Sequence, residues 1–219
     1  MTRRTVATAA LALLMLAFVA LGVWQVERRA WKLRLIAAVD ARVHAAPVAA
    51  PWPGGDAPAY LRVRATGRFV GGDTLVQAVT ERGPGFWAVA PLRTAAGWIV
   101  LVNRGFVPVG RVVAPPPGTV SVTGFRRATE PGGAFLRRND SAGGRWFSRD
   151  VAAIARARGI APVASYFIDA DATPNPGGYP IGGLTVVAFR NTHLVYALTW
   201  FGLALLCGYG LWRVRREGR

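Results

Sequence analysis

Two long stretches of the sequence carry no charged residue, and they lie near opposite ends of the 219-residue chain. The first runs from Val6 to Trp24 and the second from Leu194 to Trp212, with 19 residues in each. As an α-helix, a run of this length covers about 28 Å, close to the thickness of the hydrocarbon core of a bilayer. The pattern therefore predicts two transmembrane helices on either side of a larger domain.

The first run has a second interpretation, a signal peptide that is removed from the mature protein. Arg3 and Arg4 would form its charged start, and Ala20-Leu21-Gly22 would be its cleavage site. However, the apolar run is longer than that of most signal peptides, and Trp24 closes it where an interfacial aromatic anchor belongs. We expect the first run to be retained.

Basic residues set the expected orientation in the membrane. Arg213, Arg215 and Arg216 directly follow the second run, and only Arg190 and His193 closely precede it. Because basic residues stay on the cytoplasmic side, both ends of the chain are expected there. The basic residues after the first run oppose this orientation, but long loops cross a membrane largely regardless of charge. They are Arg28, Arg29, Lys32 and Arg34.

Apolar residues continue after the first run at a spacing of four, at Trp31, Leu35, Val39 and Val43. This spacing predicts that the first helix continues outward as an amphipathic helix. It is expected to end before Pro47, because proline does not continue a helix.

From Pro47 onward, short runs of β-branched and aromatic residues alternate with turn residues. The runs predict strands at 60–69, 74–79, 86–92, 98–107, 119–127, 166–170 and 184–190. Turns are expected at Gly71-Gly72-Asp73, Gly83-Pro84-Gly85 and Ala96-Gly97. One helix is expected at 151–158, capped by Ser148 or Asp150 and ended by Gly159.

The expected fold class is therefore an α+β membrane protein. Two transmembrane helices flank a β-rich, antiparallel, barrel- or sandwich-like extramembrane domain with one short helix. The expected segments are a cytoplasmic N-terminus (1–5), a first transmembrane helix (6–24), an amphipathic helical extension (25–46), a periplasmic β-rich domain (47–193), a second transmembrane helix (194–212) and a cytoplasmic basic tail (213–219).

Composition argues against several functions. Lys and Arg outnumber Asp and Glu by 27 to 11, but the basic residues are dispersed and no nucleic-acid-binding motif is present, so we expect no nucleic acid partner. One cysteine, Cys207, and two histidines, His44 and His193, are too few for a disulfide framework or a metal cluster. Asp169 and Asp171 are interpreted as solvated carboxylates. We expect no catalytic residues, and the chain is not expected to be an enzyme.

The sequence Asn103-Arg104-Gly105-Phe106 interrupts a strongly apolar strand. Glycine weakens a strand unless a bulge or a close backbone approach needs it. We expect a structural bend here, with the Arg104 side chain bonded to a backbone carbonyl or a carboxylate. The alternative is that Arg104 contacts a partner protein.

His193 directly precedes the second run and is the strongest candidate for a ligand-binding residue. Its helix face is aromatic near the interface and small deeper down, where Ala204 and Gly208 allow close contact with another helix. A porphyrin would find nitrogen for iron at His193 and cations for its propionates at Arg28 and Arg29. Flat rings lie nearby in the sequence, at Trp24, Tyr196 and Trp200. The simpler interpretation is that His193 forms a hydrogen bond across the junction of the two helices.

Several segments together resemble the Surfeit locus protein one family. They are residues 21–32, the strand Val100 to Pro108, Trp146-x-x-Arg149-Asp150, Phe167-Ile168-Asp169-Ala170, Pro180-Ile181-Gly182-Gly183, and Arg190-Asn191-x-His193-Leu194-x-Tyr196-Ala197-x-Thr199-Trp200-Phe201. They follow the family order from about residue 21 to residue 203.

This resemblance implies an assembly factor for haem-copper cytochrome c oxidase that holds or delivers haem a to the catalytic subunit. Its partners would be that subunit or its assembly intermediates, and membrane lipid. The histidine of the Asn-x-His-Leu motif, here His193, would contact the haem iron. A haem-independent scaffold that stabilises an oxidase intermediate is the alternative. Because only Met1 to Thr5 precede the first run, we expect a multi-pass protein of a bacterial inner membrane, with its large domain in the periplasm.

Overall fold

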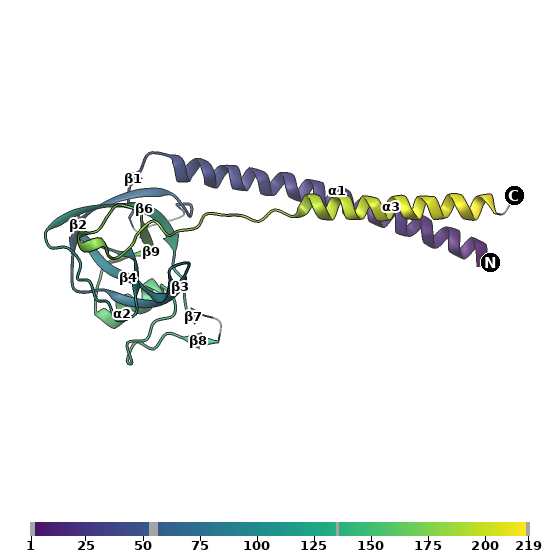
Figure 1. The fold of residues 1–219 in the computed structure, drawn as a ribbon. Coiled ribbons are helices and arrows are strands. Elements are labelled where there is room, and N and C mark those ends of the chain that lie inside the picture. The colour runs from purple at the N-terminus through teal and green to yellow at the C-terminus, as the bar shows by residue number, and fades with distance from the viewer. Residues whose placement is uncertain (1–2, 53–56, 135, 218–219) are drawn as a thin grey trace. The chain divides into compact units, whose positions relative to one another are not determined.

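A computed structural model describes residues 3–52, 57–134 and 136–217 of the chain (Figure 1). The chain divides into two compact units. One consists of Met1–Asp40 together with Val187–Arg219, and the other is Ala41–Val186. Each unit is described separately below.

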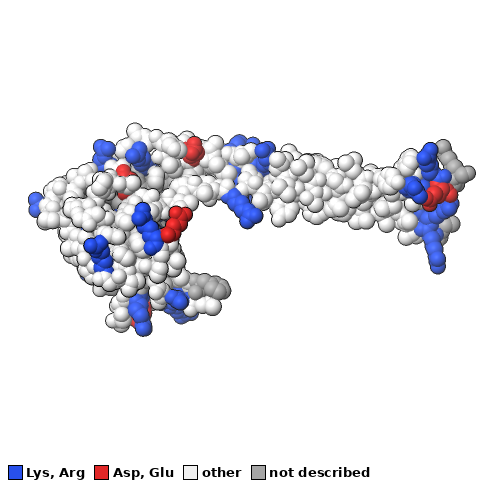
Figure 2. All heavy atoms as spheres, in the orientation of Figure 1, with Lys and Arg blue, Asp and Glu red and all other residues white. Residues whose placement is uncertain are grey.

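The first unit contains nearly all of one long helix, α1 (Arg3–His44), and the whole of another, α3 (His193–Arg216). Both are long and apolar enough to cross a membrane. Figure 2 shows an uncharged stretch along these helices, with lysine and arginine side chains at either end. Helix α1 runs without interruption through the predicted extension, but Trp31 and Leu35 of the expected apolar stripe are exposed. Only Val39 of that stripe is buried within α1.

The second unit is built around a closed ring of five strands. Along the ring, β2 (Arg62–Phe69) pairs with β6 (Thr119–Ala128), and β6 pairs with β9 (Val163–Ala170). The ring continues through β5 (Ile99–Pro108) to β4 (Gly83–Thr94). The last residues of β4 pair with β2 and close the barrel.

Shorter elements decorate this barrel. Strand β3 (Thr74–Thr80) pairs with the first half of β4, and β1 (Val48–Ala49) pairs with β2. A separate ribbon consists of β7 (Gly133–Ala134) and β8 (Arg137–Arg138), and a single 3-10 turn, η1, covers Pro176–Gly178.

The sequence predicts an antiparallel domain, but the barrel contains parallel pairs as well. Strand β5 pairs with β9 in parallel, and so does β1 with β2, whereas the other pairs within the main sheet are antiparallel. Ring closure explains the difference, because β9 returns after a helix and fills the gap between β6 and β5.

That helix is α2 (Val151–Arg158), at the residues predicted from the sequence. The carboxylate of Asp150 caps it by accepting a hydrogen bond from the backbone N–H of Ala153. Gly159 ends it in the left-handed conformation that favours glycine.

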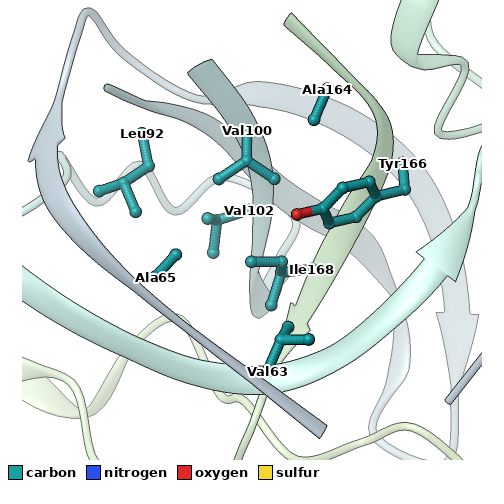
Figure 3. Packing of buried hydrophobic residues seen from close by; sticks show 8 residues of the cluster. All are labelled: Val63, Ala65, Leu92, Val100, Val102, Ala164, Tyr166 and Ile168. Carbon is teal, nitrogen blue, oxygen red and sulfur yellow. The ribbon is translucent and has the colours of Figure 1, made fainter. Parts of the chain in front are cut away.

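The barrel interior holds an apolar core (Figure 3). Its largest side chain is Tyr166, whose hydroxyl group donates a hydrogen bond to the carbonyl oxygen of Pro51. Burial raises the pKa of Tyr166 to about 12. A second cluster lies where α2 packs on the sheet and includes Ile154 and Phe167. The buried residues of the first cluster are Val63, Ala65, Leu92, Val100, Val102, Ala164, Tyr166 and Ile168.

Two local predictions were wrong. Residues 184–190 form no strand: β9 is already paired by β5 and β6, and the part of β5 beyond Asn103 is bridged by Ile181, before this segment begins. The segment Gly83-Pro84-Gly85 belongs to β4 and is not a turn, and the hairpin turns instead at residues 81–82. Gly85 is needed for a close approach, since a side chain there would collide with the carbonyl oxygen of Val107.

Candidate functional site

The two long helices of the first unit pack against each other in opposite directions, and we call this pair the helical hairpin. Going along α1, Leu11 lies nearest Gly210, Met15 nearest Gly208 and Gly22 nearest Phe201. The residue numbers rise on one helix as they fall on the other, which defines an antiparallel register.

Small residues allow this close packing, as predicted. Ala204 and Cys207 are buried on α3, and a side chain at Gly208 would reach the sulfur of Met15. Gly22 is buried on α1, where a β-carbon would lie 2.5 Å from the ring of Phe201. A stripe of small side chains therefore brings the helices within van der Waals distance.

One polar contact of the hairpin lies at the N-terminus of α3. Nδ1 of His193 is 2.7 Å from Oε1 of Gln25 on α1. His193 is half-buried, and its backbone N–H also lies within hydrogen-bond distance of the side-chain oxygen of Asn191. The interpretation of His193 as a residue that bonds across the helix junction is therefore confirmed, and it leaves Nε2 as the ring nitrogen for a further role.

The other predicted site residues lie within about two helical turns of this contact. Trp24 and Tyr196 are each about half exposed, so their rings are accessible. Arg28 lies over the ring of Trp31, with its guanidinium carbon 4.1 Å from the ring centre. Arg29 is half-buried one turn beyond Gln25.

Trp200 is placed differently from the rest. Its ring stacks on Phe18 of α1 at 5.6 Å between ring centres, deeper in the hairpin than His193. The structure therefore uses Trp200 for helix packing, while it places His193 with Trp24, Arg28, Arg29 and Tyr196 at one level of the hairpin.

These residues fit the requirements of a haem group. An imidazole whose Nδ1 is engaged by Gln25 presents Nε2, the nitrogen through which histidine commonly binds iron. Arg28 and Arg29 would supply cations for the propionates, and the exposed ring of Trp24 would supply an apolar surface.

The barrel holds a separate cluster of charged residues around Asp169, which is only 3% exposed. Oδ1 of Asp169 accepts hydrogen bonds from Asn103 at 2.8 Å and from Arg149 at 3.0 Å. Oδ2 accepts hydrogen bonds from Arg127 at 2.7 Å and from Thr185 at 3.1 Å. The interpretation of Asp169 as a solvated carboxylate is wrong, because β9 places it directly opposite Asn103 of β5.

Arg149 connects this cluster to Glu130. Its guanidinium group donates to both carboxylate oxygens of Glu130, at 2.6 Å and 3.0 Å. Burial alone would raise the pKa of Glu130, but the hydrogen bonds and positive charge of Arg149 outweigh it and lower the pKa. Burial likewise opposes the charge of Arg149, but Glu130 and Asp169 raise its pKa.

The cluster lines a polar cavity of about 240 Å³ next to residues 182–186. Two arginines face two carboxylates, so the charges of Arg127, Arg149, Asp169 and Glu130 balance. This arrangement joins β9, the start of α2 and the segment that contains Thr185. It has the features of a buried structural network.

A second buried ion pair lies at the predicted bend in β5. Arg104 is 3% exposed and donates to both oxygens of Asp73, at 2.7 Å and 3.0 Å. It also donates to the carbonyl oxygens of Val113 and Ala114. Burial of Asp73 outweighs the attraction of Arg104 and raises the pKa of Asp73. The predicted structural role of Arg104 is confirmed.

The bend itself is a β-bulge. Arg104 and Gly105 on β5 together face a single residue, Ala88, on β4. Gly105 has a φ of +131°, and a side chain there would collide with the carbonyl oxygen of Ile181. Both reasons for a glycine in a strand, a bulge and a close backbone approach, therefore apply at this position.

Comparison with known proteins decides the family. The SURF1 family model matches residues 12–205, which include most of α1, the first half of α3 and the whole barrel. The chain belongs to the SURF1 family. The resemblance noted in the sequence is thus confirmed.

Curated relatives of this SURF1-family chain are 31–37% identical to it. Surfeit locus protein 1 of Homo sapiens is 37% identical over 218 residues, which cover 88% of this chain and 71% of the human protein. Surfeit locus protein 1 of Rattus norvegicus is 36% identical over 217 residues, which cover 88% of this chain and 70% of the rat protein. A SURF1-like protein of Monosiga brevicollis is 36% identical, over 90% of this chain and 83% of its own length.

Sequence reasoning missed two parts of this SURF1-family structure. Gln25 was not recognised as the partner of His193, although it lies within the family-like segment 21–32. Arg149 and Asp169 were quoted as family-like residues but not as partners. The available signals were the position of Gln25 within the family-like segment 21–32 and the charges of Arg149 and Asp169 beside apolar residues.

Proposed function

We propose that this chain is an assembly factor for a haem-copper cytochrome c oxidase, and that it holds or delivers haem a to the catalytic subunit during maturation. Membership of the SURF1 family carries the proposal, because the match extends over the whole barrel, most of α1 and the first half of α3.

The helical hairpin supports haem as the group that is held. His193 has one ring nitrogen engaged by Gln25, and two arginines and an accessible tryptophan lie within a turn of that contact. Burial of a large macrocycle against apolar helix surface would supply much of the affinity. Haem a, once bound, would be the group transferred to the oxidase, while the residues of this chain hold and orient it.

The proposed location is a bacterial inner membrane, with two passes and the barrel in the periplasm. Two helices long and apolar enough to span a membrane support the two passes. The basic end of α3, with Arg213, Arg215 and Arg216, supports a cytoplasmic C-terminus.

Haem content and oxidase assembly are measured together to test this function. Wild type and His193→Ala are expressed in cells that make haem a but lack their own SURF1-family protein. The purified wild type is expected to show a Soret band that His193→Ala loses, and it is expected to restore oxidase activity in the membranes. His44→Ala, which changes the other histidine of the chain, is the control and is expected to retain both properties.

The outcomes separate haem binding from scaffolding. Equal haem content in the wild type and in His193→Ala would remove His193 as a ligand. Restored oxidase activity without any haem on the purified chain would favour the haem-independent scaffold. Failure of the wild type to restore oxidase activity would contradict the proposed assembly role.

A further inference from the structure

The hydrogen bond between His193 and Gln25 determines more than the position of the ring. The structure has Oε1 of Gln25 2.7 Å from Nδ1 of His193, and because an amide oxygen only accepts hydrogen bonds, this arrangement requires the proton on Nδ1. In a neutral imidazole, the second nitrogen, Nε2, then has a free electron pair. The contact thus selects one of the two neutral tautomers of His193.

Packing around the contact holds Gln25 in place. Gly22, one turn earlier on α1, lies against the ring of Phe201, and Phe18 stacks on Trp200 another turn away. These two contacts fix how far α1 can rotate or slide along α3. Gln25 is itself half-buried, so its amide faces α3 at the level of His193.

The side chain of Gln25 is uncharged, and this affects which form of the His193 ring it favours. A glutamine amide is neutral, so it orients the ring without adding a negative charge that would favour the imidazolium form. The acidic residue nearest in sequence, Glu27, is exposed. An amide at residue 25 is therefore suited to a histidine that acts as a neutral ligand, because iron binds the unprotonated nitrogen.

We propose that Gln25 is the positioning residue for the haem site, holding His193 in the Nδ1-protonated tautomer so that Nε2 is presented to iron. This inference rests on the proposed function for its haem part. Its tautomer part stands on the geometry alone. Partners that orient a metal-binding histidine typically change metal affinity by about 10- to 100-fold when they are removed.

The tautomer is tested without any haem. The full chain, labelled with ¹⁵N in histidine and held in detergent micelles, is studied by NMR, and His44→Gln assigns the remaining signal to His193. In the wild type, Nδ1 is expected to be protonated and Nε2 unprotonated. Gln25→Leu is expected to lose this preference, whereas Gln25→Glu keeps an acceptor and is expected to keep the proton on Nδ1.

A matched control uses the second glutamine of the chain. Gln77 lies on β3 and accepts a hydrogen bond from Arg137, so Gln77→Leu removes the same type of side chain away from the hairpin. It is expected to leave the His193 signals unchanged. A wild type with the proton on Nε2 would overturn the proposal, because the amide of Gln25 would then donate to Nδ1.

The haem part is tested by titration with haemin. Gln25→Leu is expected to bind haemin about 10- to 100-fold more weakly than the wild type, with an unchanged helix content by circular dichroism. Gln25→Glu is expected to restore most of the affinity. Equal affinity in Gln25→Leu, despite an altered tautomer, would overturn the positioning role. No binding by the wild type would instead reject the proposed haem function, while the tautomer result would still be decided by NMR.

Discussion

Arg104 and Asp73 are both buried, so each neutralises a charge that would otherwise be unpaired inside the protein. Removing one partner of such a pair typically costs about 3–5 kcal/mol. We expect Arg104→Ala to lower the free energy of unfolding by about 3 kcal/mol, because Asp73 and two carbonyl oxygens lose their donor. Urea denaturation of the full chain in micelles, followed by tryptophan fluorescence, measures the change.

An exposed ion pair provides the control for this change. The side chain of Arg145 is 72% exposed in its pair with Asp140, so Arg145→Ala is expected to leave the free energy of unfolding nearly unchanged. If Arg104→Ala unfolds like the wild type but fails to support oxidase assembly, Arg104 contacts a partner and the structural role is wrong.

Glu130 gives the barrel a defined dependence on pH. Its pKa in the folded chain lies below the ordinary value of 4.5, so the carboxylate stabilises the fold above that value and loses this contribution as the pH falls through the folded pKa. Because Glu130 is 37% exposed, the contribution is expected to be about 1 kcal/mol or less at pH 7.

Glu130→Gln is therefore expected to be less stable than the wild type at pH 7 and equally stable at pH values well below 4.5. Urea denaturation of both proteins at several pH values compares them. A stability difference that widens as the pH falls would show that the folded pKa is raised instead of lowered.

At the scale of elements, packing of the helical hairpin depends on a glycine on α1. A β-carbon at Gly22 would lie 2.5 Å from the ring of Phe201, so Gly22→Ala requires that ring to move or the helices to separate. We expect this change to cost about 1–3 kcal/mol, the usual range for adding a methyl group to a packed core. Thermal unfolding of the hairpin in micelles, followed by near-ultraviolet circular dichroism, measures it.

Gly202 on α3 is the matched position. A β-carbon there meets nothing within 4 Å, so Gly202→Ala adds the same methyl group to open space. Alanine favours helix by about 1 kcal/mol over glycine, so this variant is expected to be as stable as the wild type or more stable. Equal effects of the two substitutions would show that the helices do not pack through Gly22.

The β-bulge is the second element whose glycine is constrained. Gly105→Ala is expected to cost more than about 3 kcal/mol, because it combines a strained φ with a collision against Ile181. Gly110 also has a positive φ, but a β-carbon there meets nothing within 4 Å, so Gly110→Ala is expected to cost about 1 kcal/mol. Urea denaturation of both variants measures the two losses of stability. A loss in Gly105→Ala that is no larger than the loss in Gly110→Ala would show that the bulge is not constrained.

At the scale of the whole molecule, both long helices are expected to be present in the mature protein. Val6 to Trp24 is long enough to span a bilayer, and Gly22, within it, packs against α3. Intact mass spectrometry of the purified protein is expected to show a chain that begins before Val6. A mass that corresponds to a chain starting near Val23 would establish cleavage of a signal peptide.

Much of the fold could be predicted from local sequence patterns. Six of the seven expected strands, the helix capped by Asp150 and the two long helices occur where alternation, glycine and uncharged runs place them. These elements could be predicted because the type of an element follows largely from the pattern of apolar and polar residues within its own segment. The β5 bulge was also predictable, since Gly105 interrupts an otherwise apolar strand.

Partners distant in the sequence could not be predicted in the same way. Residues 184–190 have the composition of a strand, but pairing also requires a free strand edge: β9 lies between β5 and β6, and the end of β5 that β9 leaves unpaired is bridged by Ile181. Asp169 is likewise of a residue type that is usually exposed to solvent, and only its position opposite Asn103 in the sheet shows that it is buried. The candidate site shows the same limit, because His193 and Gln25 are 168 residues apart.

That separation has a consequence for the newly made chain. At a synthesis rate of about 5–20 residues per second, Gln25 is made roughly 8 to 34 seconds before His193. All the barrel strands are also made within this interval. During this time the face of α1 that contains Gly22 and Gln25 has no α3 to pack against. A chain that ends before His193 would contain every strand of the barrel but only the α1 residues of the candidate site.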